Sequence, residues 1–216
     1  MITVACVLKS GGDFKPVDVE RLRANVAQHI LTEFKFVCLT DIGYAEEETL
    51  PLLHNLPGWW SKMELFRLQG PVLYFDLDTV IVGNIDKLVD TVQRVGDNII
   101  TLRDFGKDSL ATGIVGFGMH DWSWLLKAFL TEVSLGANFA LETGRCRAII
   151  AGRRYKGDQD WMAHILPAGS VIYAQDIFRG IYSWKLHCKK GIPNDANTVC
   201  FHGKPRPWEV AEISNV

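Results

Sequence analysis

Two carboxylates follow an apolar, strand-like segment near the middle of the chain. Residues 72–75 (VLYF) are apolar and aromatic, and Asp76-Leu77-Asp78 comes directly after them. Side chains alternate across an extended chain, so Asp76 and Asp78 face the same way, about 6–7 Å apart. Two ionised acids at that spacing repel each other unless a cation lies near them, and Mg²⁺ and Mn²⁺ prefer oxygen ligands. The pattern predicts a divalent-metal site with Asp76 and Asp78 as ligands.

The same two acids also have a purely structural interpretation. Asp76 and Asp78 could cap a surface turn that leads into the next segment. The apolar stretch before them argues against a turn, because a solvated turn rarely follows such a run without a Gly or Pro at the junction. We therefore favour the metal site.

The elements around this motif predict an α/β fold with a mixed, mostly parallel sheet flanked by helices. Apolar runs predict strands over residues 2–8, 36–39, 72–75, 98–102, 110–119, 171–173 and 198–201. Helical spacing predicts helices over residues 17–31, 62–69, 85–95, 122–133 and 158–165. Ligands of such sheets bind beyond the carboxyl ends of the strands, which is where Asp76 and Asp78 lie.

Four local features accompany these elements. Ser61 and Glu64 have the spacing of a helix-capping box. Residues 44–56 are acidic and contain a proline, so we expect a connecting excursion there. Residues 152–157 (GRRYKG) are basic and predict a mobile loop. The strand 110–119 is rich in glycine, which suggests that something lies close to its backbone.

A basic loop follows the last predicted strand. It contains His202, Lys204 and Arg206, and its two prolines hold the backbone extended. A His on such a loop suits a further metal ligand, and a Lys and an Arg suit contacts with phosphate oxygens. Combined with the two acids, this loop predicts a metal-bridged diphosphate, in which the cation would stabilise a leaving diphosphate.

Two other positions have both a functional and a structural interpretation. Asp158-Gln159-Asp160 opens a predicted helix, where Asp158 is a natural N-cap, and the same polar groups would suit the recognition of hydroxyls. Lys62 lies on the helix before the central strand and could reach the anionic ligand of the metal site, although a helical Lys is more often simply solvated. Trp59-Trp60 and Tyr182 with Trp184 could stack on a sugar or belong to the core.

Composition excludes several classes of protein. The 216 residues carry a net charge of −2, which gives no basic field for nucleic acid. No apolar run approaches the ~20 residues of a transmembrane segment, and the first residues resemble a strand more than a signal peptide. Five cysteines without CxxC spacing suit reduced core thiols in a cytoplasmic protein. Walker-type and GxGxxG sequences, which would indicate a P-loop or a dinucleotide site, do not occur.

At these residues the sequence resembles the GT-A glycosyltransferases, especially the retaining enzymes of family 8 (glycogenin-like and lipopolysaccharide glycosyltransferase-like). Asp76-Leu77-Asp78 matches the DxD motif of that family. Gly203 and Pro207-Trp208 match the end of its HxxGxxKPW motif. Asp158-Gln159 matches its DQ pair, and Thr112-Gly113 resembles an element near the donor sugar. The resemblance extends from the first strand to Trp208.

The resemblance implies a GT-A, Rossmann-like fold that binds a nucleotide-sugar, with UDP as the expected nucleotide and Mn²⁺ (or Mg²⁺) as the metal. It implies transfer of the sugar to the hydroxyl of a saccharide or other acceptor with retention of configuration. It places the metal ligands at Asp76, Asp78 and His202, and the catalytic group at Asp158, Gln159 and Asp160. The expected donor-binding residues are Lys9, Thr40, Asp41, Lys62, Asp76, Thr112, Gly113, Gly203, Lys204 and Arg206.

This sequence departs from the family pattern at two positions. The family's His, three residues before the Gly, is replaced here by Cys200, and His202 stands directly before Gly203. The family's Lys before Pro-Trp is Arg206 here, which preserves phosphate binding because Arg pairs well with phosphate.

Two alternatives to a transferase remain open from the sequence. FDLDTVIV also fits the phosphatase signature of the haloacid dehalogenases, in which Asp76 would be a nucleophile beside Mg²⁺. That motif usually lies on the first strand of the chain, whereas two strands precede it here. The other alternative is a nucleotide-sugar-binding protein without activity. In each case we expect one domain over residues 1–216, with a nucleotide-binding half (1–104) and a half for acceptor and donor sugar (105–216).

Overall fold

A central sheet of seven strands organises the protein, whose computed structural model describes residues 1–43, 49–142, 145–211 and 213. In spatial order the strands are β11 (Val171–Tyr173), β6 (Ile99–Arg103), β7 (Leu110–Phe117), β4 (Val72–Phe75), β1 (Ile2–Leu8), β2 (Phe34–Thr40) and β3 (Thr49–Pro51). Strand β7 is antiparallel to both of its neighbours, and the other pairs are parallel. The predicted mixed, mostly parallel sheet is confirmed, and strands from both 1–104 and 105–216 contribute to it.

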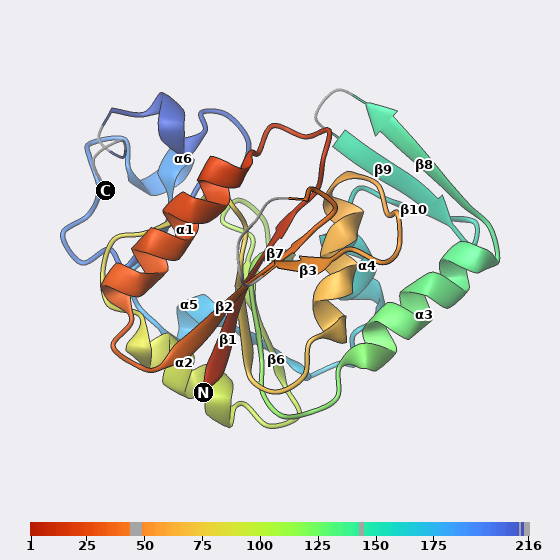
Figure 1. The fold of residues 1–216 in the computed structure, drawn as a ribbon, viewed down its shortest axis with the longest axis horizontal. Coiled ribbons are helices and arrows are strands. Elements are labelled where there is room, and N and C mark those ends of the chain that lie inside the picture. Colours follow the sequence, from red (N-terminus) through yellow and green to blue (C-terminus); the bar gives the residue numbers. More distant parts are fainter. Residues whose placement is uncertain (44–48, 143–144, 212, 214–216) are drawn as a thin grey trace.

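Helices cover both faces of this sheet (Figure 1). On one face lie α1 (Pro16–His29), α2 (Asp86–Arg94) and α5 (Ala174–Ile177), and on the other lie the 3₁₀ helix η1 (Gly58–Arg67), α3 (Ser123–Ser134) and α4 (Asp158–Ile165). Helix α1 forms because Val19, Leu22 and Val26 recur at helical spacing and bury one stripe, while Pro16 suits its first turn. No described helix is long and apolar enough to cross a membrane.

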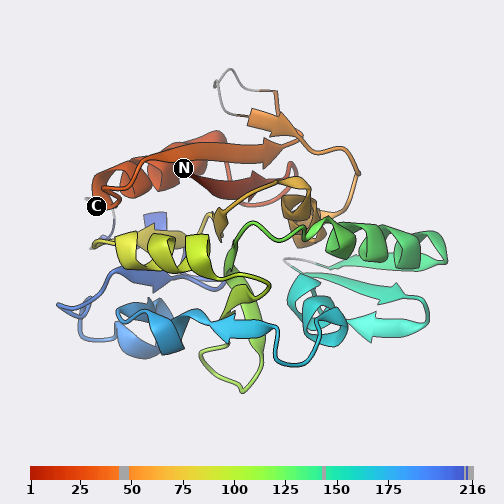
Figure 2. The ribbon, with the colours of Figure 1, turned by 90° about the horizontal axis from the view of Figure 1, so that it is seen from below.

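Two small sheets lie on opposite sides of the central one (Figure 2). The first contains β12 (Ile181–Ser183), β13 (Thr198–Cys200) and β5 (Thr79–Ile81), with α6 (Trp184–His187) and the 3₁₀ helix η2 (Pro207–Glu209) nearby in the chain. The second contains β10 (Arg153–Tyr155), β9 (Arg145–Ile150) and β8 (Ala137–Glu142). Residues 76–78 therefore connect the central sheet at β4 with the first small sheet at β5.

Several local predictions were wrong. Ser61 and Glu64 form no capping box, because Pro57 is the N-cap and the Glu64 carboxylate accepts instead from the backbone of the preceding segment. Residues 153–155 form a strand, because they pair with β9, and residues 49–51 form edge strand β3. Residues 44–48 of the predicted excursion lie outside the described residues.

Glycines in β7 make room mainly for a helix. A Cβ on Gly116 would lie 2.6 Å from Val92 Cγ2 of α2, so the close neighbour predicted for this strand is a packed helix at that position. A Cβ on Gly113 would meet Leu102 at 3.4 Å and Asp76 Oδ2 at 3.6 Å. Only Gly113 therefore borders the predicted site.

Candidate functional site

The two acids lie at the carboxyl end of β4 and are held by backbone bonds on both sides. The Asp76 amide donates to Gly113 O at 2.9 Å, which ties the motif to β7. The Phe201 amide donates to Asp78 O at 2.9 Å, which ties it to the segment after β13. Hydrogen bonds to two different sheets therefore fix the backbone from which both side chains project.

A buried lysine joins Asp76 to the start of α4. Lys62 Nζ lies 2.9 Å from Asp76 Oδ1 and 3.3 Å from Asp158 Oδ2, and it donates to Thr112 Oγ1 at 3.1 Å. Thr112 Oγ1 in turn donates to Asp158 Oδ2 at 2.6 Å. Burial alone would lower the pKa of Lys62, but the charges of Asp158 and Asp76 outweigh it and raise that pKa above its usual value. Lys62 is thus a fixed cation between two predicted site carboxylates.

Tyr74 is a site residue that the sequence analysis missed. Its hydroxyl donates to Asp76 Oδ1 at 2.5 Å, and Lys62 Nζ lies 5.4 Å from the centre of its ring. Burial, followed by the charge of Asp76, raises the pKa of Tyr74 well above its usual value, so the phenol keeps its proton. The signal was present in the sequence, because Tyr74 stands two residues before Asp76, and residues at that spacing near a strand end face the same way.

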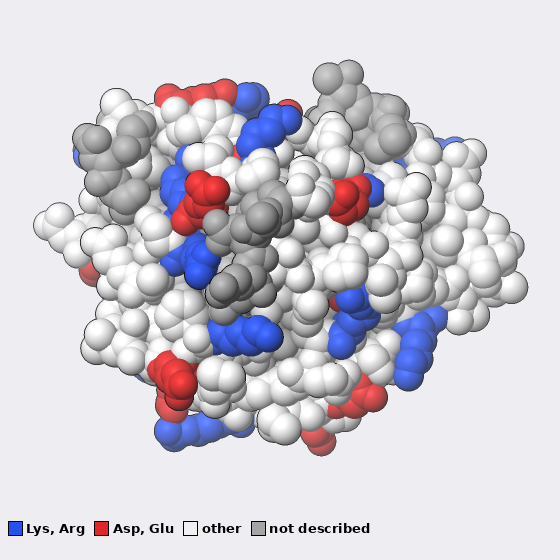
Figure 3. Space-filling view, viewed as in Figure 1, with Lys and Arg blue, Asp and Glu red and all other residues white. Residues whose placement is uncertain are grey.

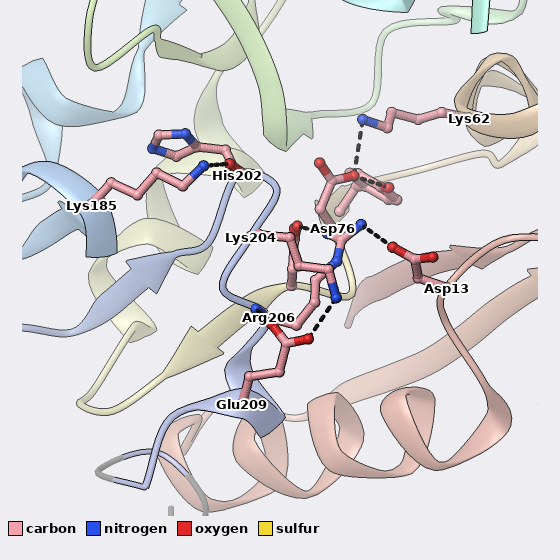
Figure 4. Close-up of polar contacts among 10 residues, drawn as sticks. Asp13, Lys62, Asp76, Lys185, His202, Lys204, Arg206 and Glu209 are labelled. Carbon is pink, nitrogen blue, oxygen red and sulfur yellow. Dashed lines mark hydrogen bonds and ion pairs between the residues drawn. The ribbon is translucent and has the colours of Figure 1, made fainter. Parts of the chain in front are cut away.

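An arginine from the C-terminal loop neutralises Asp78. Arg206 Nη1 lies 2.6 Å from Asp78 Oδ2, and Nη2 lies 3.0 Å from Asp13 Oδ2 (Figure 4). The guanidinium also lies 4.6 Å from the centre of the Phe14 ring. The loop after β1, which carries Asp13 and Phe14, thus holds Arg206 against the DxD motif. Neither of these two residues was predicted to belong to the site, and nothing in their spacing indicates the contact.

The site still has more negative than positive charge. Asp13, Asp76, Asp78 and Asp158 face two cationic side chains, Lys62 and Arg206. Burial and the charge of Asp76 raise the pKa of Asp78 to about 7, although Arg206 and Lys62 act in the opposite direction. Another positive charge near Asp78 would therefore be favourable.

The donor set fits a divalent cation that takes its remaining ligands from water and substrate. Among the described residues, no group of three or more His, Cys, Asp or Glu side chains is arranged to hold a metal ion. Mg²⁺-type sites commonly use one or two carboxylates plus waters and substrate phosphates. Asp76 and Asp78 supply two such carboxylates, at the edge of the sheet where ligands bind.

His202 does not join these carboxylates in the structure. Its Nε2 lies 2.7 Å from Ser183 Oγ, and its ring stacks on Phe105 with 5.9 Å between centres. Its carbonyl accepts from Lys185 Nζ (Figure 4). Burial, with the charge of Lys185, lowers the pKa of His202 and favours the neutral ring. The predicted set of Asp76, Asp78 and His202 is therefore not assembled, because β12 provides a partner for the histidine.

The rest of the C-terminal loop turns away from the acids. Lys204 Nζ pairs with Glu209 Oε1 at 2.5 Å, and the Lys204 side chain is 67% exposed. Gly203 has a φ of +85°, a conformation that favours glycine. Of the predicted phosphate-binding residues in this loop, the structure brings only Arg206 to the DxD motif (Figure 4).

The residues predicted to contact the nucleoside gather at the ends of β1 and β2. Lys9 Nζ lies 2.6 Å from Asp41 Oδ2, and the Ser10 amide and hydroxyl donate to the same carboxylate. Thr40 Oγ1 accepts from the Ile42 amide at 3.0 Å. A cavity of about 390 Å³ lies beside them, lined by residues 40–43 and 49–52. Their role in nucleotide binding stays a prediction.

The predicted catalytic group divides between three environments. Asp158 is not the N-cap of α4, because that position is Gly157, and its carboxylate is directed to Thr112 and Lys62 instead. Asp160 Oδ2 accepts from the Lys156 amide at 2.9 Å. Gln159 is half-buried, and its side chain forms no hydrogen bond within the described part of the chain. Only Asp158 belongs to the charged cluster around Asp76.

Comparisons with known proteins identify the fold. No protein-family model and no curated protein matches the sequence. The structure of the glycosyltransferase GlyE from Streptococcus pneumoniae TIGR4 superposes on 95% of this chain with a TM-score of 0.65 and 12% identity, and this chain covers 55% of GlyE. The galactosyltransferase LgtC, solved with donor and acceptor sugar analogs, matches 98% of this chain and 91% of its own, with a TM-score of 0.59 and 12% identity.

A further similar structure is the bifunctional glycosyltransferase WbbM, with a TM-score of 0.61 and 10% identity over 98% of this chain and 47% of WbbM. The chain thus spans about half the length of GlyE and WbbM and most of LgtC. At 10–12% identity, what this structural similarity shows is a shared fold. This chain therefore has the glycosyltransferase fold of the GT-A type that its sequence resembles.

Proposed function

We propose that this protein is a glycosyltransferase that moves a sugar from a nucleotide-sugar, with UDP as the nucleotide, to an acceptor hydroxyl with retention of configuration. The observation that carries the proposal is the pair Asp76 and Asp78 at the carboxyl end of β4, where Lys62 and Arg206 reach it from opposite sides. The fold shared with solved glycosyltransferases supports a transferase over the phosphatase alternative, as does the place of the motif on β4, after two other strands of the chain.

We also propose that Asp76 and Asp78 hold Mn²⁺ or Mg²⁺ when the donor is bound. The excess of carboxylates over cations in the cluster supports this, as does the raised pKa of Asp78. Such an ion would supply positive charge to stabilise the diphosphate that leaves with the nucleotide. His202, bonded to Ser183, has no part in this proposal.

The chain's own residues would bind and orient the donor. Arg206 Nε is a buried donor without a hydrogen-bond partner among the described residues, and a phosphate oxygen would satisfy it. Lys62 keeps Asp158 and Asp76 in fixed positions, and Asp158 would accept a hydrogen bond from a sugar hydroxyl. Gln159 would face the anomeric carbon, while Lys9, Thr40 and Asp41 would contact the nucleoside beside the 390 Å³ cavity.

The state of the cysteines supports a cytoplasmic location. All five cysteines are described and buried, and none forms a disulfide, which supports a reducing environment and hence the cytoplasm. The face shown in Figure 3 intersperses acidic and basic side chains without a broad field of one sign, which supports a saccharide partner over nucleic acid.

Binding of nucleotide-sugars to two matched variants tests the proposal. We expect the wild type to bind a UDP-sugar in calorimetry with Mn²⁺ and to bind it at least tenfold more weakly in EDTA. Asp78→Asn should remove the effect of Mn²⁺, because it removes a charged ligand. Asp90→Asn should retain it, because Asp90 is an exposed partner of Arg94 on α2. Equal donor affinity in Asp78→Asn and wild type, or release of phosphate from a phosphomonoester without any nucleotide dependence, would refute the proposal.

A further inference from the structure

Trp59 is a firmly held aromatic side chain that remains exposed. Its neighbour Trp60 is fully buried and stacks on Phe129, whereas Trp59 is 36% exposed. The Trp59 indole Nε1 donates to Cys146 O at 3.0 Å, so the polar end of the ring is already satisfied. Apolar ring surface is thus held in place and open to water, an arrangement that suits contact with a ligand.

Trp59 lies beside the cluster described above. The Gly157 backbone packs against the ring, since a Cβ there would lie 3.2 Å from Trp59 Nε1. The next residue, Asp158, approaches Lys62 Nζ at 3.3 Å. Residues three apart in a 3₁₀ helix lie on one side, so Trp59 is about 6 Å along η1 from Lys62 and on the same side. Figure 1 shows that η1 begins at the end of the sheet where β1 finishes.

A stretch of basic residues directly precedes Gly157, the residue that packs against Trp59. The sequence from 145 to 156 (RCRAIIAGRRYK) contains five Arg and Lys residues and no Asp or Glu. Arg147, Arg154 and Lys156 are exposed, and within the described ranges no acidic side chain pairs with them. The Lys156 amide is bonded to Asp160 Oδ2 at 2.9 Å, which fixes this basic end of β10 at the start of α4. A local positive charge therefore adjoins Trp59 in a chain whose net charge is −2.

We infer that Trp59 stacks on a sugar ring of the acceptor, and that the acceptor is an anionic saccharide whose phosphate or carboxylate groups contact Arg154 and Lys156. The inference rests on the proposed function, because it assigns the acceptor of that reaction. Sugar rings present C–H groups that bury apolar ring surface, and Arg and Lys pair well with phosphate and carboxylate. An isolated surface tryptophan needs no ligand, but Trp59 combines a fixed ring, a neighbouring site and unpaired cations.

Binding of paired glycans to the full chain tests this inference. The probes are neutral glycans and their phosphate- or carboxylate-bearing counterparts, with mannopentaose and mannopentaose phosphate as one pair, in the presence of UDP and Mn²⁺. We expect at least one anionic probe to bind about tenfold more tightly than its neutral counterpart. Trp59→Ala should weaken its binding about tenfold, and Trp59→Phe should restore most of it. Arg154→Glu combined with Lys156→Glu should remove the preference for the anionic probe.

Matched measurements separate this inference from the proposed function and from misfolding. UDP affinity should stay within twofold of wild type in all of these variants, because none of the changed residues touches the DxD motif. Leu135→Ala, at a residue that is 76% exposed, is the control for loss of surface hydrophobicity and should bind all probes normally. If the wild type binds UDP but no anionic probe preferentially, or if Trp59→Ala binds as well as wild type, the inference is overturned. If the wild type does not bind UDP-sugars, the proposed function fails as well.

Discussion

Replacement of Lys62 by Met removes the buried cation on which the site depends. Lys62 Nζ contacts Asp76 at 2.9 Å and Asp158 at 3.3 Å, and its side chain is only 9% exposed. Removing one partner of a buried ion pair costs about 3–5 kcal/mol, because a charge is left buried without compensation. In a chain of this size, each kcal/mol lowers the midpoint of thermal unfolding by about 2–4 °C. We therefore expect Lys62→Met to lower that midpoint by about 6–20 °C.

Urea and thermal unfolding of two companion variants make this prediction specific. Arg94→Met removes an exposed ion pair with Asp90, in which the arginine side chain is 77% exposed, and should cost no more than about 0.5 kcal/mol. The double variant Lys62→Met with Asp158→Asn removes one of the stranded charges and should recover part of the loss, as a double-mutant cycle will measure. A loss for Lys62→Met of less than about 1 kcal/mol, or equal to that of Arg94→Met, would show that Lys62 does not hold the two carboxylates.

Three other variants test separate parts of the structure. Gly180→Ala should lower the free energy of unfolding in urea by more than about 2 kcal/mol, because φ is +80° and a Cβ would lie 2.4 Å from Asp195 O. A decrease below about 0.5 kcal/mol would contradict this packing. Burial raises the pKa of Asp41, but hydrogen bonds from Lys9 and Ser10 outweigh burial and lower that pKa to about 2. Ionised Asp41 therefore stabilises the fold above pH 3.8, and this contribution is lost as the pH falls through 2. Asp41→Asn should thus cost about 1 kcal/mol at pH 7, after allowance for partial exposure, and little near pH 2; a cost independent of pH would refute the assignment. Arg206→Lys should weaken UDP binding in calorimetry about as much as Arg206→Gln, because the single ammonium group of a lysine cannot replace the two guanidinium nitrogens that contact Asp13 and Asp78. Full affinity in Arg206→Lys would show that the positive charge alone suffices.

Much of the central sheet could be predicted from local sequence. Strands β1, β4 and β6 are mainly apolar runs, and α1 and α3 bury apolar stripes at helical spacing. Such patterns specify an element without reference to the rest of the chain, because the buried face must be apolar. The described strands β3, β5, β8, β9, β10 and β12 were not predicted. Strands β3, β5, β10 and β12 have three residues each, too few to show a periodic pattern, and they form through pairing with other strands.

The sequence by itself determined that two carboxylates follow a buried strand and that Lys62 precedes them on a helical segment. The expected alternation does not extend to them, because the strand ends at Phe75 and the Thr79 amide donates to Asp76 O at 2.9 Å to close a turn. It could not determine their partners, because Arg206 is 128 residues from Asp78 and 193 from Asp13 along the chain. Only the tertiary structure shows that Arg206 forms an ion pair with Asp78 and that His202 forms a hydrogen bond with Ser183. The physical reason is that a buried apolar strand is a property of neighbouring residues, whereas an ion pair between residues far apart in the chain depends on how distant loops pack at the edge of the sheet.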